Sequence, residues 1–157
     1  MKWRFMAAAV LLAGTALAGP IPQKDGWAVH PTAHTHAELV ARLGQAVKEQ
    51  GLIVVTRAGP TKAAASRGIT IPGNMVIGVY NNDYAVRALG FSTAAMIEAP
   101  IRFYVTENAD GSATLSYKTP TLVFTPYFDE GGQGLRDLAG ELDAKFAAIA
   151  AAAAAGE

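Results

Sequence analysis

The chain has 157 residues, of which 51% are hydrophobic and 17% are charged, so its composition predicts a globular protein with a buried core rather than a disordered one. Its 13 basic and 13 acidic side chains cancel, so charge gives no reason to expect a nucleic acid or an anionic membrane surface as a partner. The chain has no cysteine, which excludes disulfides, thiol catalysis and iron–sulfur ligation.

The N-terminus has the three parts of a secretory signal peptide. Two basic residues come first, an apolar run follows from Phe5, and residues 16–18, Ala-Leu-Ala, form a small-x-small cleavage site. A retained membrane anchor is the alternative, but the run is shorter than the roughly 20 residues that span a bilayer. We therefore expect residues 1–18 to be removed and residues 19–26 to be a flexible lead-in. The mature protein would then be periplasmic or secreted, with no stable membrane anchor.

A single domain is expected over residues 27–150, and it begins with a strand and a helix. Trp27–His30 is a candidate strand. Thr35 and Glu38 have the spacing of a capping box, which predicts the start of the first helix there. A glycine typically follows the last turn of a helix, and Gly51 is at the expected place.

Two strands are expected next, with a short helix between them from Gly59-Pro60 to Ser66. The run Leu52–Thr56 is apolar and rich in β-branched residues, which predicts a buried strand. Asn74–Tyr80 is apolar on both faces, which favours a central strand, and Gly78 within it would let another group approach the backbone closely. Asn81 or Asn82 then caps a helix of about two turns.

Apolar and polar residues alternate on both sides of Asp110-Gly111, which predicts a β-hairpin. A three-residue loop that ends at Gly111 would place Val105 opposite Leu115 and keep the apolar residues of both strands on one face. That loop needs a positive φ in its last residue, and glycine adopts one without steric cost. Arg102 and Tyr104 then fall on the opposite face.

The C-terminal part is expected to contain an edge strand and a closing helix. Thr121–Tyr127 is the candidate edge strand, and apolar residues from Leu135 to Ile149 recur at helical spacing. Residues 151–157 are rich in alanine and are expected to fray, since they have little to pack against. The expected common core consists of Leu43, Ile53, Val55, Ile77, Phe103, Val105, Leu115, Leu138 and Leu142.

These elements predict an α+β fold: an antiparallel sheet of four to five strands with helices on one face, in a β-α-β-β-β-β-α-like order with short extra helices. With Gly51, Ala99-Pro100-Ile101-Arg102, Asp110-Gly111, Tyr117 and Pro120 in this order, the chain resembles the domain-of-unknown-function 302 family. The resemblance covers about residues 27–149 and implies a sheet covered on one face, with a homodimer as an option. The family's biochemical role is unsettled.

The chain departs from the family pattern in two places. Tyr80-Asn81-Asn82-Asp83 stands where members usually have a Gly-Asn-Pro-like turn. Arg57-Ala58-Gly59 stands where members often carry a histidine, so no role of that histidine transfers to this chain.

One candidate binding site combines Tyr80, Asn81 and Asn82 with Arg102. The first three follow the central strand, and a family-like arrangement puts Arg102 on a nearby strand. Together they would line a small-molecule site with hydrogen-bond donors and one cation. In the alternative interpretation, the asparagines only cap a helix and Arg102 only covers apolar surface.

The three histidines, His30, His34 and His36, lie within seven residues and form a candidate metal site. Imidazole is a good ligand for zinc and copper, and no other cofactor is indicated. In the alternative interpretation, the histidines belong to a solvated turn and simply titrate near pH 6.5.

The sequence favours an exported binding or accessory domain without catalysis, whose ligand is a small molecule or a protein. A periplasmic zinc or copper binder is the alternative, and a small hydrolase is the second alternative. Whether the protein is an enzyme is left open, leaning towards no, since the chain has no G-x-S-x-G motif and no phosphate-binding loop.

Overall fold

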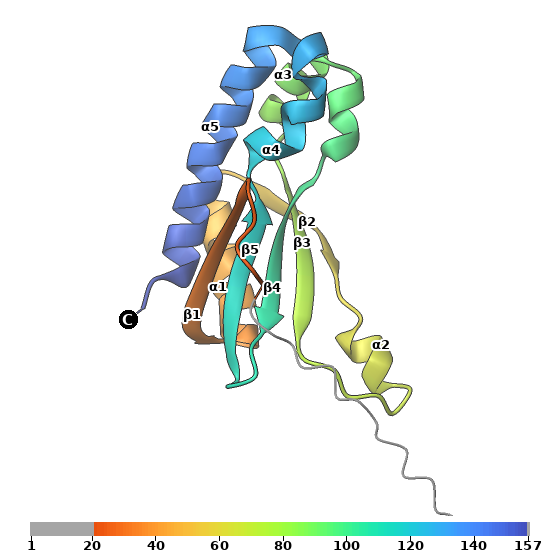
Figure 1. The fold of residues 1–157 in the computed structure, drawn as a ribbon, viewed down its shortest axis with the longest axis vertical. Coiled ribbons are helices and arrows are strands. Elements are labelled where there is room, and N and C mark those ends of the chain that lie inside the picture. The colour runs from red at the N-terminus through yellow and green to blue at the C-terminus, as the bar shows by residue number, and fades with distance from the viewer. Residues whose placement is uncertain (1–20, 157) are drawn as a thin grey trace, which may run out of the picture.

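In residues 21–156, which the computed structural model of the chain describes, five antiparallel strands form a sheet in the order β1-β5-β4-β3-β2 (Figure 1). Antiparallel pairing of neighbours and the layer of helices make this the predicted α+β fold. The predicted signal peptide lies outside the described residues. The strands are β1 (Trp27–Thr35), β2 (Ile53–Ala58), β3 (Asn74–Tyr80), β4 (Ile101–Glu107) and β5 (Ser112–Lys118).

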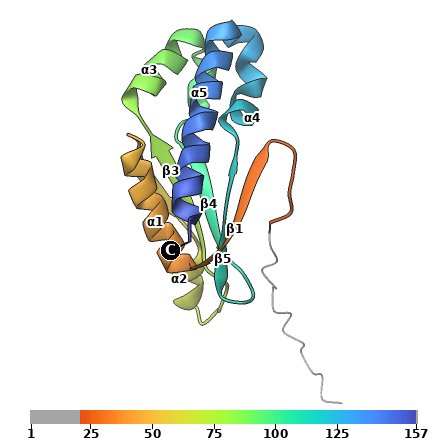
Figure 2. The ribbon, with the colours of Figure 1, turned by 90° about the vertical axis from the view of Figure 1, so that its left-hand side faces the viewer.

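Two long helices, α1 (His36–Glu49) and α5 (Phe128–Ala154), pack together on one face of the sheet (Figure 2). We call this the helix-covered face, and it carries residues such as Phe103. The opposite face, which carries Tyr104, is called the open face. None of the helices in the described residues is long and apolar enough to cross a membrane.

Short helices gather at the two ends of the molecule (Figure 1). At one end, α3 (Asn82–Phe91), the 3-10 helix η1 (Ala94–Glu98) and α4 (Pro120–Phe124) pack on one another or on α5, and we call them the helical cap. A second 3-10 helix, η2 (Thr125–Tyr127), joins α4 to α5. The helix α2 (Thr61–Ala65) lies at the other end, between β2 and β3 in the chain.

The predicted hairpin is confirmed as β4 and β5. Val105 lies opposite Leu115, and Phe103 lies opposite Tyr117. Gly111 has the predicted positive φ, 83°, and Ser112 closes the loop through a backbone N–H bond to the Asp110 carboxylate. A local turn thus sets which face every residue of both strands occupies.

Aromatic side chains form the centre of the core. The Phe103 ring stacks on Phe146 of α5 at a centroid distance of 4.5 Å and meets the Tyr117 ring edge-on at 5.1 Å. Aromatic pairs in these geometries add stabilisation beyond the area they bury. The strand β4, at the middle of the sheet, therefore carries the residue on which α5 packs.

The first helix begins as predicted. The Thr35 hydroxyl accepts the Glu38 backbone N–H at 3.3 Å, and the Glu38 carboxylate accepts the Thr35 N–H at 2.8 Å. The Thr35 N–H and the Thr35 hydroxyl, which both donate to the Glu38 carboxylate, lower the pKa of Glu38. Gly51, with a φ of 73°, follows the end of α1, also as predicted.

The prediction that Ile53 and Val55 belong to the core is wrong, since their side chains are 57% and 45% exposed. The strand β2 is an edge strand, and its register shifts between Val54 and Thr56. Only Val54 packs against the core, because an edge strand with an irregular register does not bury both of its faces. The prediction for Asn74–Tyr80 is confirmed, because β3 is paired on both sides.

The predicted edge strand Thr121–Tyr127 is wrong, since this segment forms α4 and η2. The Thr119 hydroxyl accepts the Leu122 N–H at 3.2 Å, and Pro120 occupies the first turn, where its missing N–H costs nothing. A capping threonine followed by proline was the sequence signal for a helix here.

The predicted frayed tail is also wrong for residues 151–154, which complete α5. Ala150 and Ala153 are fully buried. The Arg42 side chain, from α1, donates hydrogen bonds to the carbonyl oxygens of Ala153 and Ala155 at 3.0 and 2.8 Å. Small alanine side chains let α5 approach α1 closely, so the tail is packed.

Candidate functional site

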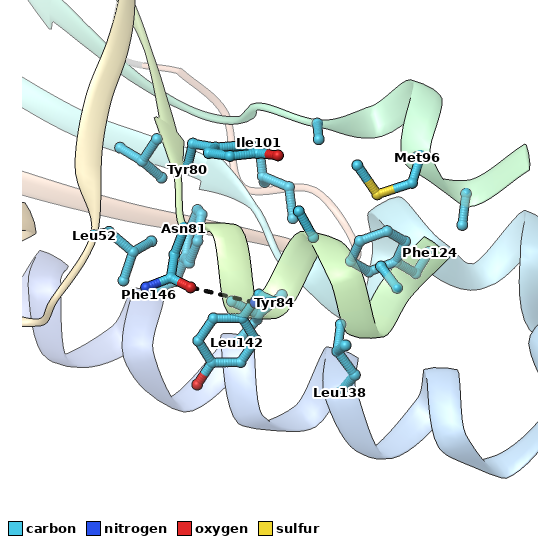
Figure 3. A pocket seen from close by; sticks show the side chains of 15 residues that line it. Leu52, Tyr80, Asn81, Tyr84, Met96, Ile101, Phe124, Leu138, Leu142 and Phe146 are labelled. Carbon is cyan, nitrogen blue, oxygen red and sulfur yellow. Dashed lines mark hydrogen bonds between the residues drawn. The ribbon is translucent and has the colours of Figure 1, made fainter. Parts of the chain in front are cut away.

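A hollow lies between the helical cap, α5 and the adjoining end of the sheet, and we call it the cap pocket (Figure 3). Its cavity volume is about 40 Å³, which exceeds the space needed for one water molecule. The residues that line it come from β3, β4, α3, η1, α4 and α5 and from the loop before β2. They include Leu52, Val79, Ala88, Met96, Ile101, Phe124, Leu138, Leu142 and Phe146.

Tyr80 and Asn81, two of the predicted ligand-binding residues, line this pocket. Asn81 caps α3, because its side-chain oxygen accepts the backbone N–H groups of Asp83 and Tyr84 at 2.8 and 3.2 Å. Its amide nitrogen donates to the Gly51 carbonyl oxygen at 2.9 Å. Both ends of the Asn81 amide are therefore engaged in holding α3 against the end of α1.

The chemistry of the cap pocket is apolar. The Asn81 amide is occupied by the protein's own backbone, and the walls are aliphatic, aromatic or thioether groups. A ligand that buried an unpaired polar group here would lose roughly 2–7 kcal/mol, and a buried charge would cost far more. At about 40 Å³, the pocket suits a small apolar group rather than a whole aromatic ring.

The other two predicted residues are not brought into this pocket. Asn82 is the first residue of α3, and its side chain is exposed. Arg102 faces away, because it lies on the open face between the helix-facing residues Ile101 and Phe103. The predicted group of four is therefore divided between two faces of the sheet.

Arg102 lines a second hollow, on the open face, which we call the open-face groove. Its volume is about 290 Å³, and Trp27, Tyr104 and Lys118 line it with Arg102. Glu98 also lines it and accepts a hydrogen bond from the Tyr127 hydroxyl at 2.8 Å, which together with burial raises the pKa of Tyr127. Sequence reasoning missed Trp27 and Lys118, although the alternation of the hairpin already placed Lys118 on the same face as Arg102.

The three histidines point to different surroundings. The His30 ring stacks on Tyr117 at 6.0 Å, and burial lowers the pKa of His30. The His34 Nε2 lies 2.8 Å from the Ala155 carbonyl oxygen. Residues 21–156 contain no cluster of three or more His, Asp or Glu side chains suited to a metal ion. The metal hypothesis stays a prediction without a geometric site behind it.

His36 lies instead beside Gly73, near Glu107. A Cβ at Gly73 would come within 3.1 Å of both the His36 Nδ1 and the Glu107 Oε2. The Gly73 backbone N–H donates to that carboxylate oxygen at 2.5 Å. A side chain at this position would crowd both groups, so glycine lets the loop before β3 lie close to the start of α1.

The fold and the cap pocket define a small α+β domain built around an antiparallel sheet, with no catalytic motif in its sequence. The chain belongs to the family described as Domain of unknown function DUF302, whose model matches residues 29–153. The solved structure described as "uncharacterized conserved protein DUF302 from Bacillus stearothermophilus" has the same fold, with a TM-score of 0.71. It is 18% identical, and the match covers 81% of this chain and 97% of that chain. No curated protein matches this chain.

Proposed function

We propose that this protein is an exported binding domain that holds a small apolar group in the cap pocket and catalyses no reaction. The observation that carries the proposal is the cap pocket itself, a hollow of about 40 Å³ with apolar walls that no side chain fills. Large side chains of the surrounding core, such as Phe146, are fully buried. Protein interiors are otherwise close-packed, so a retained apolar hollow is a natural place for a ligand. Export rests on the N-terminal sequence alone.

The surface of the helical cap supports an apolar ligand. Val86 of α3 is 71% exposed and Ile97 of η1 is 79% exposed, and both elements also contribute to the pocket wall. Exposed large apolar residues beside an apolar pocket are typical of a binding surface. The ligand class is therefore a small apolar group, either as a free small molecule or as an exposed side chain of a partner protein.

The test is a titration with xenon gas, a small apolar probe, followed by methyl NMR of Met96 and Leu142. We expect saturable shifts of both methyl groups in the parent protein. Ala88→Leu places a larger side chain in the pocket and should abolish the shifts. Val86→Leu, on the exposed side of the same helix, is the matched control and should leave them unchanged.

A second variant guards against misfolding of Ala88→Leu, because overpacking a core costs about 1–3 kcal/mol. Leu142→Ala enlarges the same pocket and should strengthen xenon binding and admit benzene, with Met96 as the reporter since Leu142 is removed. Met96 shifts that persist in Ala88→Leu, or that do not grow in Leu142→Ala, would contradict the proposal.

A further inference from the structure

The open-face groove lies at one end of the sheet, and the residues around it come from four strands that run side by side. Trp27 of β1 is opposite Lys118 of β5, and Arg102 of β4 is opposite Gly78 of β3. In the adjacent row Tyr104 is opposite Ser116. The side chains of Trp27, Arg102, Tyr104 and Lys118 stand around a hollow of about 290 Å³, whereas Thr56 and Pro100 occupy the space over Gly78.

Positive charge exceeds negative charge in the groove. Arg102 and Lys118 line it, and the Lys24 Nζ lies over the Trp27 ring, 5.6 Å from its centroid. The one lining carboxylate, Glu98, accepts a hydrogen bond from the Tyr127 hydroxyl. Within residues 21–156 the salt bridge found, Arg87–Glu141, lies elsewhere, so neither Arg102 nor Lys118 is neutralised by a described carboxylate.

Flat and apolar surface lies next to this charge. Trp27, Tyr104 and Val76 contribute to the walls, and the Lys118 Nζ lies 5.8 Å from the centroid of the Trp27 ring. An indole ring offers a planar face for stacking, and an ammonium group beside it can bind an anion carried on a stacked ring. The guanidinium of Arg102 presents paired donors that match the two oxygens of a carboxylate or phosphate.

The same face also has an unsatisfied polar group. Ser116 is completely buried, and its hydroxyl has no hydrogen-bond partner among the described residues. Ser116 lies directly opposite Tyr104 but does not itself line the groove, so a ligand there would contact Tyr104 and not this hydroxyl.

We propose that the open-face groove binds a small anion in which a carboxylate or phosphate is attached to a flat aromatic body. Arg102 and Lys118 bind the anionic oxygens, and Trp27 with Tyr104 contacts the ring. The two hollows differ in their linings, although Ile101 contributes to both, and the proposal does not depend on the apolar ligand.

Tryptophan fluorescence tests this directly. The two tryptophans are Trp3 and Trp27, so Trp3→Phe in the full chain leaves Trp27 as the reporter. We expect benzoate or phenyl phosphate to change the Trp27 emission saturably at low salt, and calorimetry of the same titration to give one site. The tighter of the two ligands, benzoate or phenyl phosphate, shows whether the site prefers a carboxylate or a phosphate.

Arg102→Gln and Lys118→Gln should each weaken binding about tenfold or more, since a charge-assisted hydrogen bond is lost. The matched control is Arg136→Gln, because Arg136 also lies over an aromatic ring, Phe128 at 4.5 Å, but outside the groove. Arg102 and Lys118 are both exposed, so these variants should keep the parent's melting temperature.

Three outcomes would overturn the proposal. Benzamide binding as tightly as benzoate would remove the need for an anion. Inorganic phosphate binding as tightly as phenyl phosphate would remove the need for a ring. If Arg102→Gln and Arg136→Gln bound the aryl anion with equal affinity, Arg102 would not contribute to binding. Ala88→Leu should leave aryl-anion binding unchanged, which separates this site from the cap pocket.

Discussion

The two faces of the sheet are made by alternate residues of the same strands, yet their chemistry differs completely. On the helix-covered face, Phe103 and Tyr117 are packed under Phe146 of α5. On the open face, the neighbouring residues are Tyr104 and Ser116, beside a groove with unneutralised cations. The period of two in a strand therefore lets one hairpin supply the core and a binding surface together.

The hollows on the two sides differ in the same way. The cap pocket holds about 40 Å³ within apolar walls, whereas the open-face groove holds about 290 Å³ beside Arg102 and Lys118. An apolar lining selects for apolar groups because unpaired polar atoms are costly to bury against it. In the groove, the charged side chains stay hydrated until an anion replaces the water. The polarity of a ligand therefore decides which of the two hollows it can use.

The largest expected effect is a difference in the free energy of unfolding between variants at two adjacent residues of β4. Phe103→Ala removes a fully buried ring and should lower the free energy of unfolding by about 3–5 kcal/mol. Tyr104→Ala, on the open face, should cost about 1 kcal/mol. Urea denaturation of both variants measures the difference, and equal losses would contradict the division between the two faces.

The hairpin loop sets that division, and Gly111→Val tests it. A β-branched residue resists the φ of 83°, so the variant should lose at least about 1 kcal/mol of stability. The control is Gly140→Val in α5, where no neighbour lies within 4 Å of the added Cβ and φ is not positive. Thermal unfolding should show a clear loss for the first variant only; a similar loss for both would point to a general cost of valine.

Arg42 of α1 holds the C-terminal end of α5 on the helix-covered face. Arg42→Gln removes donors to the Ala153 and Ala155 carbonyl oxygens and should cost about 1 kcal/mol. Amide exchange should accelerate in the last turn of α5. Lys48→Gln, at the exposed end of α1, is the control and should leave that exchange unchanged. Unchanged exchange in Arg42→Gln would mean that the buried alanines alone hold the tail.

The smallest expected effect concerns charge on the helix-covered face. Burial lowers the pKa of His30 below its usual value, so the unfolded chain takes up a proton at a higher pH than the folded one. Stability is therefore fully present above about pH 6.5 and is lost as pH falls towards the folded pKa. Chemical denaturation at pH 7.5 and 5.0 should show a smaller acid loss in His30→Leu than in the parent. An identical acid loss in both would assign it to other groups.

Much of the fold was predictable because its signals are local. The capping box at Thr35, the asparagine cap at Asn81 and the positive φ at Gly111 each depend on residues within a few positions of one another. Asn81 also shows the limit, because the same side chain that caps α3 lines the cap pocket. A local pattern identifies the cap but says nothing about what packs beside it.

The candidate site was only half predictable. Tyr80 and Asn81 do lie at a pocket, but Arg102 does not join them, because the pleat of β4 turns it to the open face. The alternation of the hairpin already placed Arg102 opposite the core-facing Phe103. What sequence could not supply was the partner strand β1, which brings Trp27 beside Lys118 from the other end of the chain.

The sequence by itself determined most element types, the hairpin register and the family, since these depend on periodicity, caps and turn residues. Only the tertiary structure decided that β2 lies at an edge with Ile53 and Val55 exposed, and that Ala153 in the alanine-rich tail is buried. The physical reason is that burial belongs to the packed neighbours of a residue and not to the residue. An apolar strand is exposed when no element covers it, and a run of alanines is buried when a helix such as α1 can approach it closely.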